Sequence, residues 1–347
     1  TACFMLRLFM FHRSKTCALI KRIWKALLLK DESSSSPQED RILKYEGRNL
    51  LDYLTEDQLE ILASAIESKG AEMLDCVKFP VGDLSSKIYA SSLAYLFCKL
   101  WRWPDITTTT EIRCLGYCNS TKDYPCINPY HWSLVYQAER VACIKRDSYS
   151  KFLPEDEAPS EGVSVATGGS KQSSLDPFCW CRLAYWENST RVGTQFAVSK
   201  SNFSVFGNLP HGDGLCLADL AQSHPTSDQK ITRTREKIGL GLHLSQESDG
   251  VWLYNRSREP LFVNSPTLEV PNSMSFLVHK VLPGYSIKVF DYDVSYHHQL
   301  VQADFSDGPR NPYAVRVSFA KGWGPRYSRQ FITSCPCWLE ILLAPPR

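Results

Sequence analysis

Cysteine and histidine residues in the first half of the chain have a spacing that suits a metal ion. The segment Cys126-Ile-Asn-Pro-Tyr-His131 begins eight residues after Cys118, and Cys76 and Cys98 lie upstream. Zinc in a structural site takes four ligands, and three cysteines with one histidine are a common set. Such a closed set leaves no position for a reactive water, so the pattern predicts a structural metal rather than a catalytic one. The spacing alone leaves Cys98 and Cys114 as competing ligands.

A row of basic residues in the second half of the chain has the side chains that bind phosphate. Lys230, Arg233 and Lys237 fall at i, i+3 and i+7, so on a helix they line one face. Clustered Lys and Arg side chains recognise phosphate through charge-assisted hydrogen bonds. A solvated helix face is the usual explanation of such a row, but a second basic segment weakens that explanation here.

The second basic segment is Lys321-Gly-Trp-Gly-Pro-Arg-Tyr-Ser-Arg329, which is predicted to be a loop between strands. Its cations are Lys321, Arg326 and Arg329, and its glycines let the backbone approach a ligand closely. Trp323 is expected to anchor the loop or to pack against a partner. Because binding residues concentrate on loops of rigid scaffolds, this segment is a candidate binding site.

The composition is that of an ordinary globular protein. The 347 residues are 43% hydrophobic and 22% charged, which excludes a wholly disordered or fibrous chain. The net charge of +2 excludes a whole-chain polycation that grips nucleic acid. No apolar run reaches the roughly 18–20 residues that a membrane span needs. The thirteen cysteines are clustered and odd in number, which favours an intracellular protein with reduced thiols.

Composition shifts divide the chain into four segments. Residues 1–39 are predicted to be a basic tail and a Ser-rich linker, 40–145 a first domain, 146–177 a flexible acidic linker, and 178–347 a second domain. A partly disordered tail is the favoured interpretation of the N-terminal segment. A nuclear-import signal, a membrane-surface helix and a mitochondrial presequence are its alternatives, and Met10 is a plausible true start.

The two domains differ in their predicted elements. In the first, a helix is expected over 54–66, with Thr55 and Gln58 as a capping box, and short strand-like runs follow to Trp132. In the second, many short alternating runs predict a β-sandwich interrupted by a helix over 226–238. The runs expected to be strands include 195–198, 250–254, 285–290 and 314–319.

Longer motifs resemble the SMAD family. Trp101-Arg-Trp-Pro-Asp105 followed by Cys126-x-Asn-Pro-Tyr-His131 is similar to the zinc-bearing MH1 domain. Trp180-Cys-Arg-Leu-Ala-Tyr-Trp-Glu187 and Ser318-Phe-Ala-Lys-Gly-Trp-Gly324 are similar to the MH2 domain, and Arg329-Gln-Phe-Ile-Thr-Ser-Cys-Pro-Cys-Trp-Leu-Glu340 resembles the inhibitory members most. The resemblance implies an α+β fold, with a small zinc-binding MH1-like domain before an MH2-like β-sandwich, related to FHA domains, with flanking helices.

The resemblance also implies particular sites. It assigns one structural zinc ion (Zn²⁺) to Cys76, Cys118, Cys126 and His131. It further assigns a receptor- and phosphoserine-binding surface to the following residues of the second domain: Arg233, Lys237, Lys321, Trp323, Arg326 and Arg329. The implied partners are a phosphorylated type I receptor serine/threonine kinase of the TGF-β or BMP pathway, the co-SMAD and the receptor-activated SMADs.

DNA binding is expected to be weak or absent. SMAD domains that read DNA insert a basic hairpin into the major groove, and the corresponding stretch, 77–97, has only Lys78 and Lys87 as bases, offset by Asp83. A DNA-binding transcription regulator or co-repressor in the nucleus is therefore the alternative function rather than the first choice. A scaffold that binds no phosphate is a third.

The expected function is a non-enzymatic antagonist of TGF-β-superfamily signalling, present in the cytoplasm and the nucleus. The chain ends Leu342-Leu-Ala-Pro-Pro-Arg347 without the Ser-x-Ser tail that receptors phosphorylate, yet it keeps the basic residues that would bind a phosphorylated partner. A HECT ubiquitin ligase is another partner that the resemblance implies. However, no Pro-Pro-x-Tyr motif lies between Trp132 and Leu175, which argues against recruitment through a WW domain.

Overall fold

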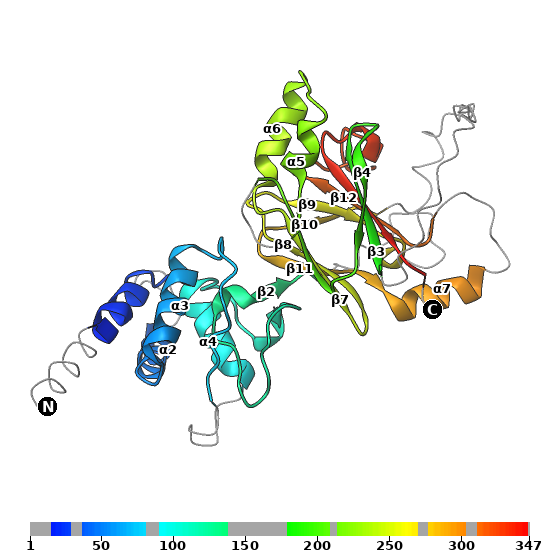
Figure 1. Ribbon diagram of the computed structural model, residues 1–347. Coiled ribbons are helices and arrows are strands. Elements are labelled where there is room, and N and C mark those ends of the chain that lie inside the picture. The colour runs from blue at the N-terminus through cyan, green and yellow to red at the C-terminus, as the bar shows by residue number, and fades with distance from the viewer. Residues whose placement is uncertain are drawn as a thin grey trace, which may run out of the picture.

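The computed structural model describes residues 15–28, 37–80, 90–137, 179–208, 214–269, 277–302 and 311–345. The described residues form an N-terminal, mainly helical domain that ends at residue 137 and a C-terminal domain of two β-sheets that begins at residue 179 (Figure 1). The predicted hairpin around Lys87, the acidic linker and the start at Met10 lie outside these ranges.

The N-terminal domain packs its helices around one apolar core. Its elements are a helix over residues 15–25, α2 (Pro37–Leu51), α3 (Glu56–Glu67), α4 (Ala90–Trp101), 3-10 turns at Thr109–Glu111 and Pro129–His131, and the short strands β1 (Ile112–Cys114) and β2 (Trp132–Val135). The predicted capping box is confirmed: Thr55 Oγ1 accepts a hydrogen bond from Gln58 N, and Gln58 Oε1 accepts one from Thr55 N.

Two expectations for this domain are wrong. Residues 15–25, within the segment expected to be a partly disordered tail, are a helix that packs on the domain, because Leu19, Ile20 and Ile23 are buried in the core. Residues 90–101 form α4 rather than strands; this helix is apolar on several sides, so its sequence lacks the polar face that marks an amphipathic helix. Within the described ranges, no helix combines the length and apolar character needed to cross a bilayer.

The C-terminal domain is the predicted sandwich. Its strands are β3 (Cys181–Glu187), β4 (Thr190–Val198), β5 (Asn202–Phe206), β6 (Gly214–Cys216), β7 (Leu242–Glu247), β8 (Gly250–Asn255), β9 (Leu261–Asn264), β10 (His279–Val281), β11 (Tyr285–Asp291), β12 (Ala314–Phe319) and β13 (Trp338–Leu343). The α-helices of the described residues here are α5 (Leu217–Gln222), α6 (Gln229–Ile238) and α7 (Tyr292–Gln302). The four predicted strand runs all lie in or overlap these strands.

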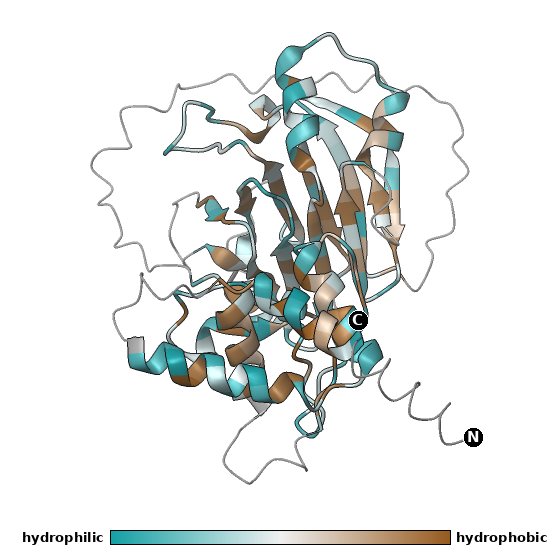
Figure 2. Cartoon of the chain, turned by 90° about the vertical axis from the view of Figure 1, so that its left-hand side faces the viewer, coloured by the Kyte–Doolittle hydropathy of each residue, from teal (hydrophilic) through white to brown (hydrophobic). Residues whose placement is uncertain are grey.

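Two sheets face each other across the sandwich core. One has six strands in the order β10-β9-β12-β13-β3-β4, and the other contains β11-β8-β7-β5-β6. Apolar residues run along the strands, while hydrophilic residues cover much of the helices at the upper end (Figure 2). The core between the sheets includes Leu183, Val205, Leu244, Val263, Val289, Val317 and Leu339.

The second sheet continues into the N-terminal domain. β2 pairs in parallel with the start of β11, and β1 pairs with β2, so the strand order becomes β1-β2-β11-β8-β7-β5-β6. Leu134 N donates to Gly284 O at 3.0 Å, and Tyr136 N donates to Ser286 O at 2.8 Å. The two domains therefore share one backbone hydrogen-bond ladder.

Side chains reinforce this junction. Arg113 of β1 forms a 2.7 Å ion pair with Glu247 of β7 and lies 3.7 Å from the ring centroid of Trp252 on β8. Arg102, after α4, donates a 2.6 Å hydrogen bond to the Tyr254 hydroxyl. Because the Arg113 and Glu247 side chains are only 18% and 27% exposed, their attraction is less screened than that of a surface pair.

Removal of the Arg113 side chain should loosen the contact between the domains. Arg113→Ala loses both the ion pair and the cation–π contact, so docking should weaken by about 1–3 kcal/mol. Small-angle X-ray scattering should then report a larger radius of gyration. Arg41→Ala, which removes an exposed cation of α2, is the control and should leave that radius unchanged; equal radii for the two variants would show that Arg113 does not hold the domains together.

Candidate metal centre and basic surface

Four residues from separate segments of the N-terminal domain meet at one point. The ligand atoms of Cys76, Cys118, Cys126 and His131 all lie within 4.8 Å of one another. Cys76 Sγ is 3.7 Å from Cys118 Sγ and 3.4 Å from His131 Nδ1, and Cys126 Sγ is 3.5 Å from the same nitrogen. This Cys₃His group could hold a metal ion, and it is the set that the resemblance assigned.

Short local structures place the four side chains. The main chain around Cys126 meets the segment after Cys76 through a bridge between Lys78 and Cys126. Cys118 closes a turn in which its N–H donates to Leu115 O. His131 ends a 3-10 turn whose start is capped by Asn128. The ligands are therefore fixed by backbone hydrogen bonds rather than by a single regular element.

The histidine is oriented for coordination through Nδ1. Its Nε2 lies 2.9 Å from Leu74 O, and because a carbonyl only accepts, Nε2 must carry the proton. Nδ1 then points a lone pair at the three sulfurs. A backbone carbonyl that fixes the tautomer in this way is the usual outer partner of a metal-bound histidine.

The cluster already favours a thiolate. Hydrogen bonds from Cys118 and Cys126, the two largest causes, lower the pKa of the Cys76 thiol well below its ordinary value. Asn119 N also donates to Cys76 Sγ at 3.4 Å. Since a metal binds thiolates rather than thiols, this arrangement lowers the cost of the first deprotonation.

The two competing cysteines lie beside the cluster rather than in it. Cys98 is fully buried on α4, and burial raises the pKa of its thiol to about 12, as expected of an inert core thiol. Cys114 is hydrogen-bonded to Cys118, which is the main cause that lowers its pKa, but its sulfur is not among the four converging ligand atoms.

The first set of predicted phosphate-binding residues lies on α6, at the upper end of the sandwich (Figure 1). Asp228 caps this helix by accepting a 2.7 Å hydrogen bond from Lys230 N. Ile231, Thr234 and Ile238 are buried beneath it, whereas Lys230, Arg233 and Lys237 are exposed. The i, i+3, i+7 row therefore faces outward, as its spacing predicted.

A buried ion pair attaches α6 to the sheet. Arg235 donates two hydrogen bonds, of 2.6 and 2.7 Å, to the carboxylate of Glu187 at the end of β3. The Glu187 side chain is 0% exposed and also accepts from the Tyr185 hydroxyl at 2.9 Å. Paired with Glu187, the Arg235 guanidinium has its pKa raised above the ordinary value.

The second set lies on the loop 320–331 that follows β12. Gly324 N donates to Arg329 O at 2.7 Å and Tyr327 N to Gly324 O at 2.9 Å, so the loop folds back on itself. A Cβ at Gly322 would lie 2.5 Å from the Tyr327 ring, which explains why glycine stands there. The loop has a fixed shape, and Arg326 is exposed on it while Lys321 and Arg329 are half-buried.

Trp323 anchors this loop from inside. It is 1% exposed and packs in a small apolar cluster with Phe262, Cys335 and Trp338. Of the two roles expected from the sequence, the structure places it as an anchor. Phe331, two residues after Arg329, is an aromatic side chain that is 68% exposed and that the sequence analysis did not select.

The turn between β8 and β9 links the two sets of cations, and sequence analysis missed it. Glu259 forms a 3.0 Å ion pair with Lys237 of α6, and Ala320 N at the start of the loop donates to Pro260 O at 3.0 Å. Arg258 of this turn is exposed. The polar run that follows the predicted strand 250–254 was the sequence signal for this turn. We define the basic surface as Lys230, Arg233, Lys237, Arg258, Lys321, Arg326 and Arg329.

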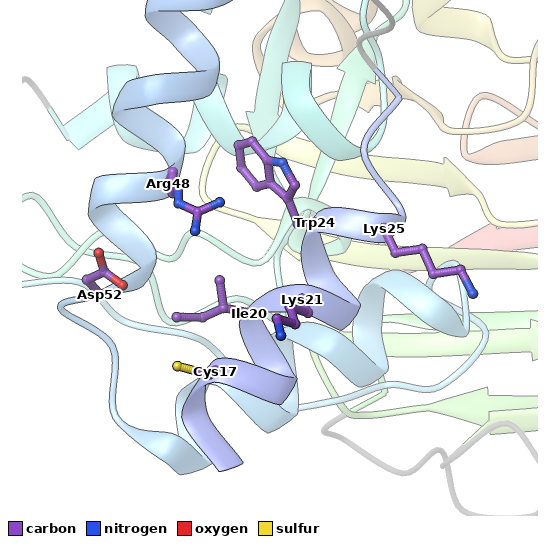
Figure 3. A pocket seen from close by; sticks show the side chains of 7 residues that line it. All are labelled: Cys17, Ile20, Lys21, Trp24, Lys25, Arg48 and Asp52. Atoms are coloured by element: carbon purple, nitrogen blue, oxygen red, sulfur yellow. The ribbon is translucent and has the colours of Figure 1, made fainter. Parts of the chain in front are cut away.

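A separate shallow cleft lies in the N-terminal domain, between the helix over 15–25 and α2 (Figure 3). Its lining includes Lys21, Trp24, Lys25 and Arg48. The Arg48 guanidinium carbon is 6.0 Å from the Trp24 ring centroid. These cations belong to another domain than the basic surface and were not among the predicted binding residues.

Comparison with known proteins matches both domains. The MH1 domain family matches residues 43–136, and the MH2 domain family matches residues 179–344. Mothers against decapentaplegic homolog 6 of Gallus gallus is 43% identical over 332 residues, which cover 88% of this chain and 76% of that protein. Mothers against decapentaplegic homolog 7 of Homo sapiens is 37% identical over 338 residues, covering 86% and 78%.

Among solved structures, the IAD domain of interferon regulatory factor 9 matches with a TM-score of 0.34 and 14% identity, over 50% of this chain and 87% of that chain. This similarity is too low to support a conclusion about fold or function.

The two domain matches and the Cys₃His group define an MH1 domain followed by an MH2 domain, and this confirms the predicted α+β fold. The chain belongs to the SMAD family, in its inhibitory branch. The predicted class of function, an antagonist of TGF-β and BMP signalling, is thereby confirmed, and the DNA-binding alternative is not favoured.

Two arginines of α6 should behave differently when removed. Arg235→Ala leaves the buried Glu187 carboxylate with His224, whose Nδ1 lies 3.2 Å from Oε2, in place of its two arginine hydrogen bonds, so the free energy of unfolding should fall by about 3 kcal/mol. Arg233→Ala removes an exposed cation and should change it by less than about 0.5 kcal/mol. Urea denaturation measures both, and similar values for the two variants would contradict the anchoring role of Arg235.

Proposed function

We propose that this chain antagonises signalling by occupying the phosphorylated type I receptor serine/threonine kinase with the basic surface of its MH2 domain. Receptor-activated SMADs would then be excluded from the same receptor. Binding of the co-SMAD through the MH2 domain is a second route to the same effect. The protein would act without enzymatic activity, in the cytoplasm and the nucleus, with little or no affinity for DNA.

The observation that carries this proposal is the presence of two sets of cations on rigid supports, of which Lys237 has an anionic partner, Glu259, among the described residues. Within the described ranges, Arg233, Arg326 and Arg329 have no carboxylate partner. α6 is fixed by the Arg235–Glu187 pair and the loop by Trp323, so the backbone that carries the cations loses little entropy on binding. A phosphate with nearly two negative charges and three acceptor oxygens suits such a group.

Trp323 would contribute to binding indirectly, by fixing the shape of the loop. Buried under the loop, it would position Lys321 and Arg326 rather than touch the receptor. Phe331, exposed two residues after Arg329, offers the apolar contact that a peptide next to a phosphoserine can use.

We further propose that the Cys₃His group holds one structural zinc ion through Cys76, Cys118, Cys126 and His131. Three sulfurs and one imidazole nitrogen are the ligand types that zinc takes in closed sites. The ion would join segments of the MH1 domain that share few backbone hydrogen bonds. Domain limits of 40–145 for MH1 and 178–347 for MH2 are part of the same proposal.

Binding of the full chain to a type I receptor cytoplasmic segment should depend on receptor phosphorylation and on the basic surface. Lys321→Ala/Arg329→Ala should weaken binding to the phosphorylated segment roughly 30- to 100-fold, as expected for the loss of two charge-assisted contacts. Isothermal titration calorimetry at two salt concentrations measures this, and the wild-type affinity should fall as salt rises.

The control is Lys122→Ala/Arg41→Ala, which removes the same charge from exposed positions of the MH1 domain. The proposal fails if phosphorylated and unphosphorylated segments bind alike, or if this control weakens binding as much as the double variant of the loop.

The zinc content of two variants should distinguish Cys118, a proposed ligand, from Cys114, which lies outside the ligand set. The purified chain should contain one zinc per molecule by inductively coupled plasma mass spectrometry, and Cys118→Ser should lose it. Cys114→Ser, a neighbouring thiol outside the four-atom group, should retain it. Chelation of the ion should lower the melting temperature of the wild type and not that of Cys118→Ser; retention of zinc by Cys118→Ser would refute this ligand set.

A further inference from the structure

Among the cations of the basic surface, Lys237 differs because it already has an anionic partner. Its Nζ lies 3.0 Å from Glu259 Oε1, and the two side chains are 43% and 37% exposed. No other ion pair joins a member of the basic surface to a described residue. The cation next to Arg233 on the outer face of α6 is thus neutralised in the free protein.

The position of Glu259 is built into the turn that carries it. Its carbonyl oxygen accepts hydrogen bonds from Asn255 Nδ2 at 2.9 Å and from Ser257 Oγ at 2.6 Å. Asn255 is fully buried and also receives the N–H of Ser257. The next residue, Pro260, is tied to the start of the basic loop through Ala320 N. The backbone that carries this carboxylate is therefore fixed, and the carboxylate contacts α6 through Lys237.

The turn that carries Glu259 contacts both α6, through Lys237, and the start of the loop, through Pro260 and Ala320. We propose that Glu259 is an internal competitor for the anion site: it occupies Lys237 in the free protein and is displaced when a phosphorylated segment binds. This inference rests on the proposed function and specifies how the site is regulated. An exposed ion pair of this kind adds little to stability, so a ligand with a larger charge can replace it.

The competition lowers affinity for every anion, because part of the binding free energy is used to separate Lys237 from Glu259. Removing the carboxylate should therefore strengthen binding, and the gain should require the Lys237 ammonium. General electrostatics makes a different prediction, since any lost negative charge near the surface would strengthen binding whether or not Lys237 is present.

The chain offers a matched control for this distinction. Glu236 lies on α6 next to Lys237, is exposed and has no partner among the described residues. Glu236→Gln and Glu259→Gln thus remove the same charge from neighbouring positions, but only Glu259→Gln breaks an ion pair.

The experiment is a double-mutant cycle on the full chain with two probes, the phosphorylated receptor segment and inorganic phosphate. Glu259→Gln should tighten binding about three- to fivefold, and Glu236→Gln by less than about 1.5-fold at physiological salt. In the Lys237→Ala background, the effect of Glu259→Gln should fall to that of Glu236→Gln. Calorimetry follows the segment and ³¹P NMR titration follows inorganic phosphate.

The two probes separate the outcomes. Equal binding of phosphorylated and unphosphorylated segments would overturn the receptor function, while the phosphate titration still decides the role of Glu259. Equal gains from the two glutamine variants, a gain that persists without Lys237, or no phosphate binding by either wild type or Glu259→Gln would each overturn the competitor role.

Discussion

The pairing of Arg235 with the buried carboxylate of Glu187 is the constraint on which the binding end of the molecule depends. Glu187 ends β3, and the residue after it is tied to the base of the basic loop: Asn188 N donates to Cys335 O, and Trp338 Nε1 donates to Asn188 O. One strand end therefore fixes both α6 and the loop. Two sets of like charges, which repel each other, are held together at the cost of one buried ion pair.

The two domains use different means to reach the same rigidity. In the MH2 domain a large apolar core between two sheets carries the loops. The MH1 domain is small, and the segment from residue 109 to 137 contains only two short strands and two 3-10 turns. The four converging side chains, from Cys76 to His131, can hold this segment together where a small apolar core supplies few contacts. A metal there would replace missing apolar contacts.

The sequence was most informative where local chemistry decides the structure. The Thr55 capping box, the outward row on α6 and the alternating strands depend on neighbours within a few residues, and all were predictable. Sequence analysis failed for α4, because a helix buried on several sides shows no clear period, and for the helix over 15–25, whose apolar residues need a distant core. The position of Glu259 beside Lys237 depends on a turn far along the chain.

The parallel pairing of β2 with β11 means that the MH1 domain covers an edge of a sheet in the MH2 domain. Among the described residues, β11 has β8 on one side and β2 on the other. Without β2, the groups at Gly284 and Ser286 that now bond Leu134 and Tyr136 would lie open at the border of a sheet. An open border is a template for pairing with another chain, and β2 of the first domain covers this part of it.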